Sequence, residues 1–130
     1  MTGYRPRRGK DRGSASIAIA IVFPAIAVLF LALAQAVMLA AAHQVAVSSA
    51  EEGLRVARAH NHTLAQGRSA AITFAHHEPV LLSPTVTASG PLTITVTVRG
   101  RAPSLLPGVH LSTAGTVAGP RERFTTSGQR

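Results

Sequence analysis

Residues 17–42 read IAIAIVFPAIAVLFLALAQAVMLAAA, and this apolar run dominates the chain. It lies inside a longer segment, residues 13–50, that contains no Asp, Glu, Lys or Arg. As an α-helix, these 26 residues would extend about 39 Å, whereas the hydrocarbon core of a bilayer is about 30 Å thick. The rest of a 130-residue chain has too little apolar material to surround such a helix on every side. We therefore predict a single transmembrane helix over residues 14–42.

Positive charge is concentrated before this run. Of thirteen Lys and Arg residues, five lie in the first twelve positions, opposed there by one acid. The basic residues after the run are farther from it and stand beside two glutamates. By the positive-inside rule, residues 1–13 form a basic cytoplasmic leader and the C-terminal region lies outside the cytoplasm. This topological role explains the basic leader, so we expect a membrane and no nucleic acid as its partner.

A cleavable signal peptide is the alternative explanation, because it also joins a basic start to an apolar run and a small-residue cut. Ala34-Gln35-Ala36 has the small-x-small pattern, and cleavage after Ala36 would release a chain that begins at Val37. However, the run from Ile17 is already 18 residues long before Gln35, whereas the apolar part of a signal peptide has roughly 7 to 15 residues. The length favours a retained membrane helix.

Beyond residue 42 the helical pattern continues and becomes amphipathic. Apolar residues recur at steps of three and four, which predicts one helix over residues 14–59. These residues are Val47, Ala50, Leu54 and Ala57. On the polar side we expect Glu51 to pair with Arg55, and Glu52 to pair with the same surface. Thr63 with Gln66 forms a capping box for a second helix through Phe74, within an extracytoplasmic helical region of residues 43–78.

From Val80 onward the apolar period changes from helical to two. Residues 85–89 and 91–98 alternate, and Ser89-Gly90 between them predicts a hairpin turn. The side chains expected to face the core are Val86, Ala88, Leu92, Ile94, Val96 and Val98. Residues 109–118 offer a third strand. The prediction is an α+β fold, with a small antiparallel sheet in residues 79–120 that the helix covers and a flexible tail at 121–130.

The sequence contains few groups of residues that could bind a metal or catalyse a reaction. His60 and His62 lie two residues apart and His76 and His77 are adjacent, so neither pair has the i, i+4 spacing of a helical metal site, and we interpret them as solvated loop histidines. Neighbouring glutamates point in different directions on a helix, which argues against a paired-carboxylate site. The chain has no Cys. We expect no catalytic residues, no metal and no cofactor, and a protein that is not an enzyme.

Residues 12–24, RGSASIAIAIVFP, resemble the opening of bacterial TadE-like pseudopilins, in which RGSA precedes an apolar residue, a Glu and an apolar run with Pro. Residues 50–59, AEEGLRVARA, are similar to the EGxRxAxA stretch after that family's membrane helix. The sheet region and the ending GPRERF, residues 119–124, also look like the longer members. The resemblance covers residues 12–59 best.

The resemblance implies a pilin-like fold and a role in assembly. The expected function is that of a minor pseudopilin, or a membrane-anchored assembly component, of a Tad (Flp) pilus or a related secretion system. Its expected location is the bacterial cell membrane, as a single-pass protein with a cytoplasmic N-terminus. The implied partners are other pseudopilins, the pilus inner-membrane platform and a prepilin peptidase that cuts between Gly13 and Ser14.

Two further features concern assembly. Ala32, Ala36 and Ala40 have the small-xxx-small spacing that lets membrane helices approach closely. The fifth residue after the implied cut is Glu in the family and is Ala18 here, so the carboxylate that would pair with a neighbouring subunit's terminal amine is missing. The competing function is a secreted, small β-rich protein that binds a surface after signal peptidase releases it. A small membrane enzyme is the third and least favoured class.

Overall fold

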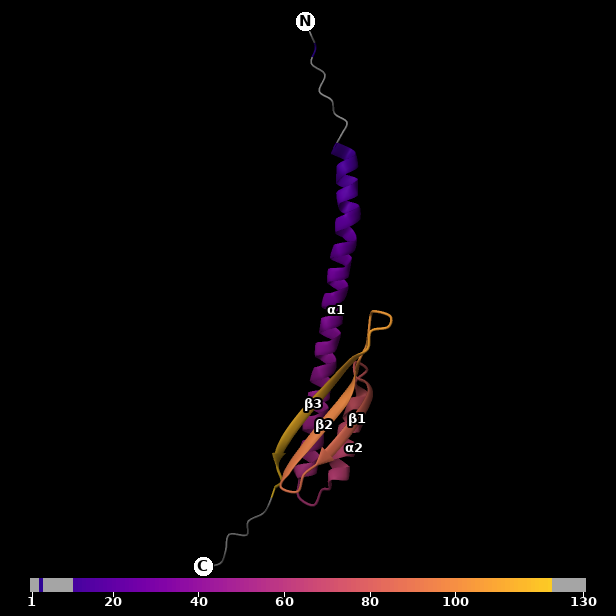
Figure 1. The fold of residues 1–130 in the computed structure, drawn as a ribbon. Coiled ribbons are helices and arrows are strands. Elements are labelled where there is room, and N and C mark those ends of the chain that lie inside the picture. Colours follow the sequence, from indigo (N-terminus) through magenta and orange to yellow (C-terminus); the bar gives the residue numbers. More distant parts are fainter. Residues whose placement is uncertain (1–2, 4–10, 123–130) are drawn as a thin grey trace, which may run out of the picture. The chain divides into compact units, whose positions relative to one another are not determined.

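A computed structural model describes residue 3 and residues 11–122 of the chain. Five elements follow one another, as Figure 1 shows: α1 (Asp11–Arg58), α2 (Leu64–His77), β1 (Leu82–Ser89), β2 (Thr93–Ala102) and β3 (Leu111–Pro120). This order confirms the predicted α+β fold. The predicted leader lies mostly outside the described residues, as does the predicted tail after residue 122. The chain divides into two compact units, Met1–Ala34 and Gln35–Arg130.

In the first unit the described chain is helical from Asp11 onward and belongs to α1. The helix begins three residues before the predicted start, because no proline stands between Asp11 and Ser14 to stop it. It also continues through Pro24, although this residue cannot donate a backbone hydrogen bond. Residues 13–33 are exposed at every position.

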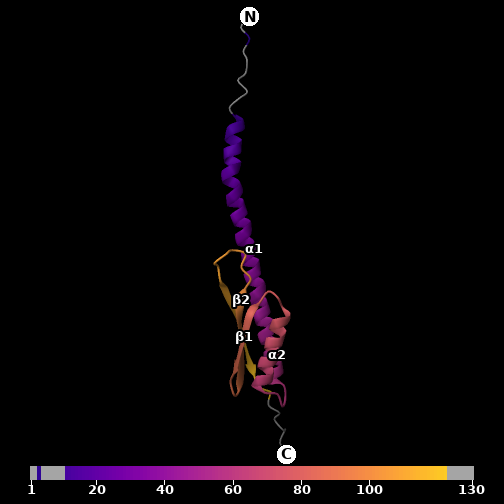
Figure 2. The ribbon, with the colours of Figure 1, turned by 90° about the vertical axis from the view of Figure 1, so that its right-hand side faces the viewer.

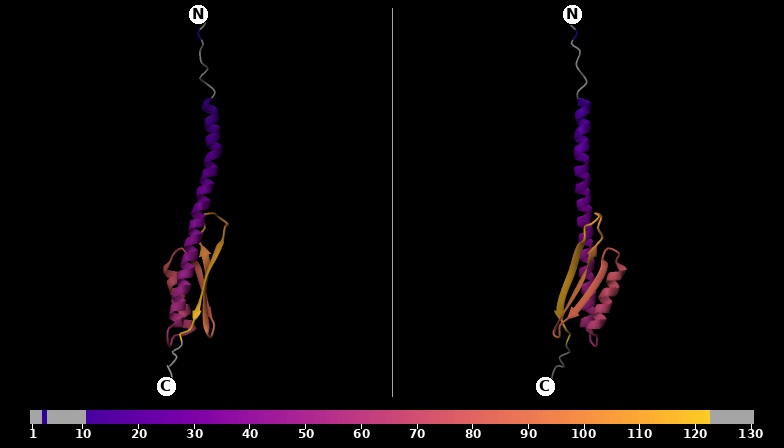
Figure 3. Two further views of the ribbon diagram at one scale, coloured as in Figure 1. Left: turned by 90° about the vertical axis from the view of Figure 1, so that its left-hand side faces the viewer. Right: turned by 45° about the vertical axis from the view of Figure 1, so that its right-hand side comes forward.

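The second unit consists of the remainder of α1, helix α2 and the sheet. Figures 2 and 3 show this part of α1 and α2 side by side on one face of the sheet. The predicted amphipathic face of α1 is confirmed, since Ala50, Leu54 and Ala57 are buried and Val47 is half-buried.

The predicted capping box at the start of α2 is confirmed. The Gln66 backbone N–H donates to Thr63 Oγ1 at 3.2 Å, and the Thr63 N–H donates to Gln66 Oε1 at 2.8 Å. The predicted end at Phe74 is wrong, because α2 continues to His77. The helix stops only where Pro79 disfavours a helical conformation in the residue before it.

The three strands form an antiparallel sheet with β2 at its centre. In the predicted hairpin turn, Gly90 has φ +116°, and a Cβ there would lie 1.8 Å from the Thr93 carbonyl oxygen, so the turn requires glycine. Each strand differs from its predicted bounds by a few residues. Strand β2 extends to Ala102 because residues beyond the apolar alternation still pair with β3. Leu92, predicted to face the core, is 59% exposed because it lies in the turn before β2.

The core is built largely from small residues. Ile94, Val96 and Val98 of β2 are its largest fully buried apolar side chains. The helices contribute mainly alanines: Ala42, Ala46, Ala50 and Ala57 from α1 and Ala71 and Ala75 from α2. Backbones consequently approach closely, and a Cβ on Gly115 of β3 would lie 2.5 Å from the Ala46 carbonyl carbon.

Candidate functional site

The most extensive candidate site is the apolar surface of α1 in the first unit. Its large apolar side chains are mostly about two-thirds exposed, with Phe23 at 69%. Within Gly13–Arg58, the most apolar window has a mean hydropathy of 2.9 and no buried residue. Residues 13–34 at about 1.5 Å each extend about 33 Å, close to the hydrocarbon thickness of about 30 Å. Residues 13–34 are therefore a candidate membrane-spanning helix. The sequence prediction of one apolar membrane helix in this region agrees with this, but it extended the span to residue 42, whereas Gln35 and Ala42 belong to the second unit and are buried there.

The implied cleavage position lies at the beginning of this helix. Gly13 and Ser14 are both exposed and belong to the first turn of α1. A Cβ added to Gly13 would have no atom within 4 Å. One helical turn further on, Ala18 borders a shallow apolar depression of about 320 Å³ together with Ile19 and Val22. The family's glutamate position thus lies among apolar side chains.

The three alanines predicted for helix packing are all exposed. Ala32, Ala36 and Ala40 make no part of the buried core. The buried alanines of α1 begin at Ala42 and recur four residues apart, at Ala46 and Ala50. The two sets of alanines therefore differ in what they contact. The buried set packs against other parts of this chain, whereas the exposed set, Ala32, Ala36 and Ala40, is accessible to a partner helix.

Gln35 is the functional candidate that the sequence prediction missed. Its side chain is 7% exposed. Its Nε2 donates to the Pro103 carbonyl at 3.1 Å, and its Oε1 accepts from the Leu105 N–H at 2.8 Å. One amide side chain thus holds the connection between β2 and β3. The available signal was that Gln35 is the only strongly polar side chain in the apolar run.

The predicted ion pair uses a different glutamate. Arg55 binds Glu52 rather than Glu51, with Nη2 to Oε1 at 2.6 Å and Nε to Oε2 at 2.9 Å. At i, i+3 the two side chains meet on the helix surface with both carboxylate oxygens engaged. The bond from Arg55 lowers the pKa of the Glu52 carboxyl, and the same bond raises the pKa of Arg55. The positive charge of Arg55 is therefore balanced by the carboxylate of Glu52 at the surface.

The histidine pairs lie in different settings. His60 and His62 belong to the segment between the two helices, as predicted, and both are exposed. His76 and His77 are also exposed but lie in the last turn of α2, so assigning them to a loop was wrong. Within residues 11–122, no three His, Asp or Glu side chains are grouped closely enough to hold a metal ion.

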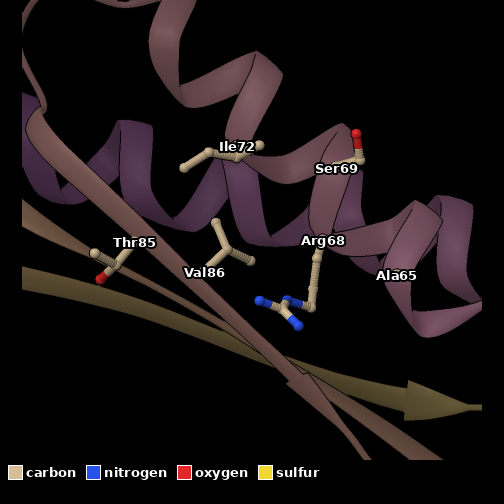
Figure 4. A pocket seen from close by; sticks show the side chains of 6 residues that line it. All are labelled: Ala65, Arg68, Ser69, Ile72, Thr85 and Val86. Atoms are coloured by element: carbon tan, nitrogen blue, oxygen red, sulfur yellow. The ribbon is translucent and has the colours of Figure 1, made fainter.

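An open groove of about 470 Å³ lies between α2 and β1. Figure 4 shows Arg68 extending from α2 into the space beside Val86 of β1, with Ile72 farther along the helix. Ser69 and Thr85 add hydroxyl groups, and Ala65 completes the described lining. The lining is largely apolar with one cation, and it brings together no nucleophile and base.

Comparison with protein-family models, curated proteins and solved structures found no match to this chain. The similarity of residues 12–24 and 50–59 to TadE-like pseudopilins therefore stays a prediction. The geometry of the candidate membrane helix and of Gln35 is independent of that similarity.

Proposed function

We propose that this protein is a minor pseudopilin, or a membrane-anchored assembly component, of a Tad (Flp) pilus or a related bacterial secretion system. The main support is that one helix, α1, supplies both the exposed, mostly apolar residues 13–33 and the buried alanines of the second unit. Such a helix suits a subunit that stays in the membrane until it is assembled. The short motifs at residues 12–24 and 50–59 support the same assignment.

The proposed topology is a single pass with the N-terminus in the cytoplasm. Five basic residues precede the span within twelve positions. After the span, the first charged residues occur only at Glu51 and Glu52, and Glu52 already neutralises Arg55. This asymmetry favours a cytoplasmic leader and an extracytoplasmic second unit.

The contacts of Gln35 favour a retained membrane helix over release by signal peptidase. Cleavage after Ala36 would remove this side chain from the second unit. The Pro103 carbonyl and the Leu105 N–H would then lose the amide to which they are hydrogen-bonded. Each of these partly buried hydrogen bonds typically contributes about 0.5–1.5 kcal/mol. The released protein would therefore be less stable than the anchored one.

The alanine at position 18 favours a specialised subunit over a component of the filament shaft. A carboxylate within an apolar helix is costly unless a partner charge compensates it. In this chain no carboxylate occupies that position, so the contact with a neighbouring terminal amine is lost. An assembly factor or an initiating tip subunit fits this composition, and we expect no enzymatic activity.

The N-terminus of the mature protein tests the proposal. In cells that carry a prepilin peptidase, mass spectrometry should find a chain that begins at Ser14. Gly13→Phe should block this cut because the side chain crowds the scissile backbone. Gly3→Phe is the matched control, since a Cβ at Gly3 also has no atom within 4 Å. A terminus at Val37 would establish the signal peptide instead, and an intact Met1 would rule out processing.

Restoring the family's carboxylate tests the role of position 18. Ala18→Glu should increase the fraction of protein that co-sediments with filaments, because the carboxylate can pair with a neighbouring terminal amine. Ala18→Gln has the same length without the charge and should leave co-sedimentation unchanged. If Ala18→Glu is processed normally and gives no increase, a Glu-dependent contact plays no part in assembly.

A further inference from the structure

We propose that the connection between β2 and β3, residues 103–110, rests on the membrane surface and inserts Leu105 among the lipid headgroups. The inference depends on the proposed membrane anchoring and adds a second contact with the bilayer. Its partner is the phospholipid surface at the end of the span formed by residues 13–34.

The position of the connection follows from Gln35. This residue comes directly after residues 13–34, whose helical length of about 33 Å matches a bilayer core of about 30 Å, and it is the first buried residue of α1 after the exposed residues 13–33. Both polar atoms of its amide bind the backbone of Pro103 and Leu105, at 3.1 and 2.8 Å. The residues bound to Gln35 must therefore lie near the boundary between lipid and water.

The composition of the connection suits this boundary. Residues 103–110 read PSLLPGVH and include no acidic residue. Leu105 is 45% exposed, and Leu106 and Val109 are half-buried. His110 ends the connection and Arg101 precedes it in β2, where its guanidinium also donates to Ser83 Oγ at 3.4 Å. Both residues are exposed and can face anionic headgroups. An exposed leucine beside basic groups fits a lipid surface better than it fits water.

The backbone of the connection is already hydrogen-bonded, which lowers the cost of leaving water. Ser104 Oγ accepts from the Leu106 N–H at 3.2 Å and donates to the Leu106 carbonyl at 2.8 Å. The Val109 N–H also donates to the Leu106 carbonyl, at 3.3 Å. Pro103 and Pro107 have no N–H to satisfy. The segment can thus approach lipid without exposing many unpaired amides.

Leu92 provides a comparison within the same chain. It is 59% exposed and precedes β2, whereas Leu105 follows β2. The ten residues of β2 extend roughly 33 Å, so the two leucines lie at opposite ends of the strand. Only Leu105 is attached to the end of the candidate span. Both leucines are exposed, so exposure does not identify which of them contacts the membrane. The hydrogen bond between Gln35 and the Leu105 N–H identifies Leu105.

Tryptophan fluorescence tests the inference, because the chain contains no Trp. Full-length Leu105→Trp and Leu92→Trp proteins are reconstituted into vesicles of phosphatidylcholine and phosphatidylglycerol. The lipids are brominated either near the headgroup or near the end of the acyl chain. Leu105→Trp should give blue-shifted emission and be quenched mainly by the shallow bromines. Leu92→Trp should give the emission of a hydrated indole and be quenched by neither lipid.

Phe23→Trp separates failure of this inference from failure of the anchoring. If Phe23→Trp is quenched by deep bromines while Leu105→Trp behaves like Leu92→Trp, the membrane contact of the connection is refuted and the anchor stands. If Phe23→Trp is not quenched, the anchoring fails and the inference fails with it. Blue-shifted but unquenched emission from Leu105→Trp would mean that protein covers this residue, which also overturns the inference.

A second variant tests the positioning role of Gln35. Gln35→Leu, combined with Leu105→Trp, introduces an apolar side chain of similar size and removes both hydrogen bonds to the connection. Quenching by shallow bromines should decrease because the connection is no longer held at the end of the span. Circular dichroism should show retained helix and sheet. Unchanged quenching in a folded protein would show that Gln35 does not position Leu105.

Discussion

At the residue scale, two glycines bring the helices of the second unit together. A Cβ on Gly53 of α1 would lie 2.7 Å from the Ala71 Cβ, and a Cβ on Gly67 of α2 would lie 2.7 Å from the Gly53 carbonyl oxygen. The neighbouring atoms are backbone or the short side chain of alanine, which cannot rotate away. Glycine weakens a helix by about 1 kcal/mol relative to alanine, so close packing explains why Gly67 lies inside α2.

We predict that Gly67→Ala destabilises the protein. The added methyl group should lower the free energy of unfolding by about 1–3 kcal/mol, since overpacking outweighs the gain in helix propensity. Denaturant unfolding followed by circular dichroism measures the change. Ser69→Ala, at an exposed position of the same helix, is the control and should be neutral or slightly stabilising. A stabilising Gly67→Ala would mean that the helices do not pack closely.

At the element scale, α2 begins where local sequence directs it. Thr63 and Gln66 satisfy one another's backbone N–H groups, so the start of the helix needs no help from distant residues. Its buried face then depends on packing, with Ala71 and Ala75 in the core. The cap sets the first turn, and the contacts with α1 and the sheet hold the helix in place.

We predict that removing the capping box lowers the stability of the protein moderately. Thr63→Ala should lower the free energy of unfolding by about 1 kcal/mol, because the Gln66 N–H loses its acceptor. Thr73→Ala lies at an exposed position within the same helix and serves as the matched control, with little effect expected. Equal losses for both variants in urea unfolding would contradict a specific role for the cap.

At the scale of the whole molecule, the sheet depends on α1 for its core. Ile94, Val96 and Val98 are fully buried in a cluster that includes Ala42, Ala46 and other α1 alanines. Burial of each such large apolar side chain contributes about 1.5–3 kcal/mol. A small antiparallel sheet without this cover would leave its apolar face in water.

Truncation tests this dependence. A fragment of residues 35–130 should unfold in a single cooperative transition, because it retains every α1 residue of the core cluster. A fragment of residues 51–130 should lack a cooperative melt, since Ala42, Ala46 and Ala50 are removed. Thermal unfolding followed by circular dichroism distinguishes the two. A sharp melt of the shorter fragment would show that the sheet and α2 are stable without the earlier part of α1.

Local patterns were sufficient for much of the fold and for part of the site. The apolar run predicted the exposed helix, the capping box predicted α2, and Ser89-Gly90 predicted the hairpin. Each depends on residues that are close in sequence, so propensity and periodicity report it directly. The same reasoning misplaced Leu92, because an alternating pattern does not show where pairing with a neighbouring strand begins.

The sequence by itself determined that a long apolar helix within residues 14–42 can span a bilayer, and that a short helix and three strands follow. Only the tertiary structure decided that Gln35 binds Pro103 and Leu105, about 70 positions away, and that glycines set the distance between the helices. Helix and strand patterns arise from interactions over a few residues. Contacts across the chain depend on how whole elements pack, and no local pattern specifies that packing.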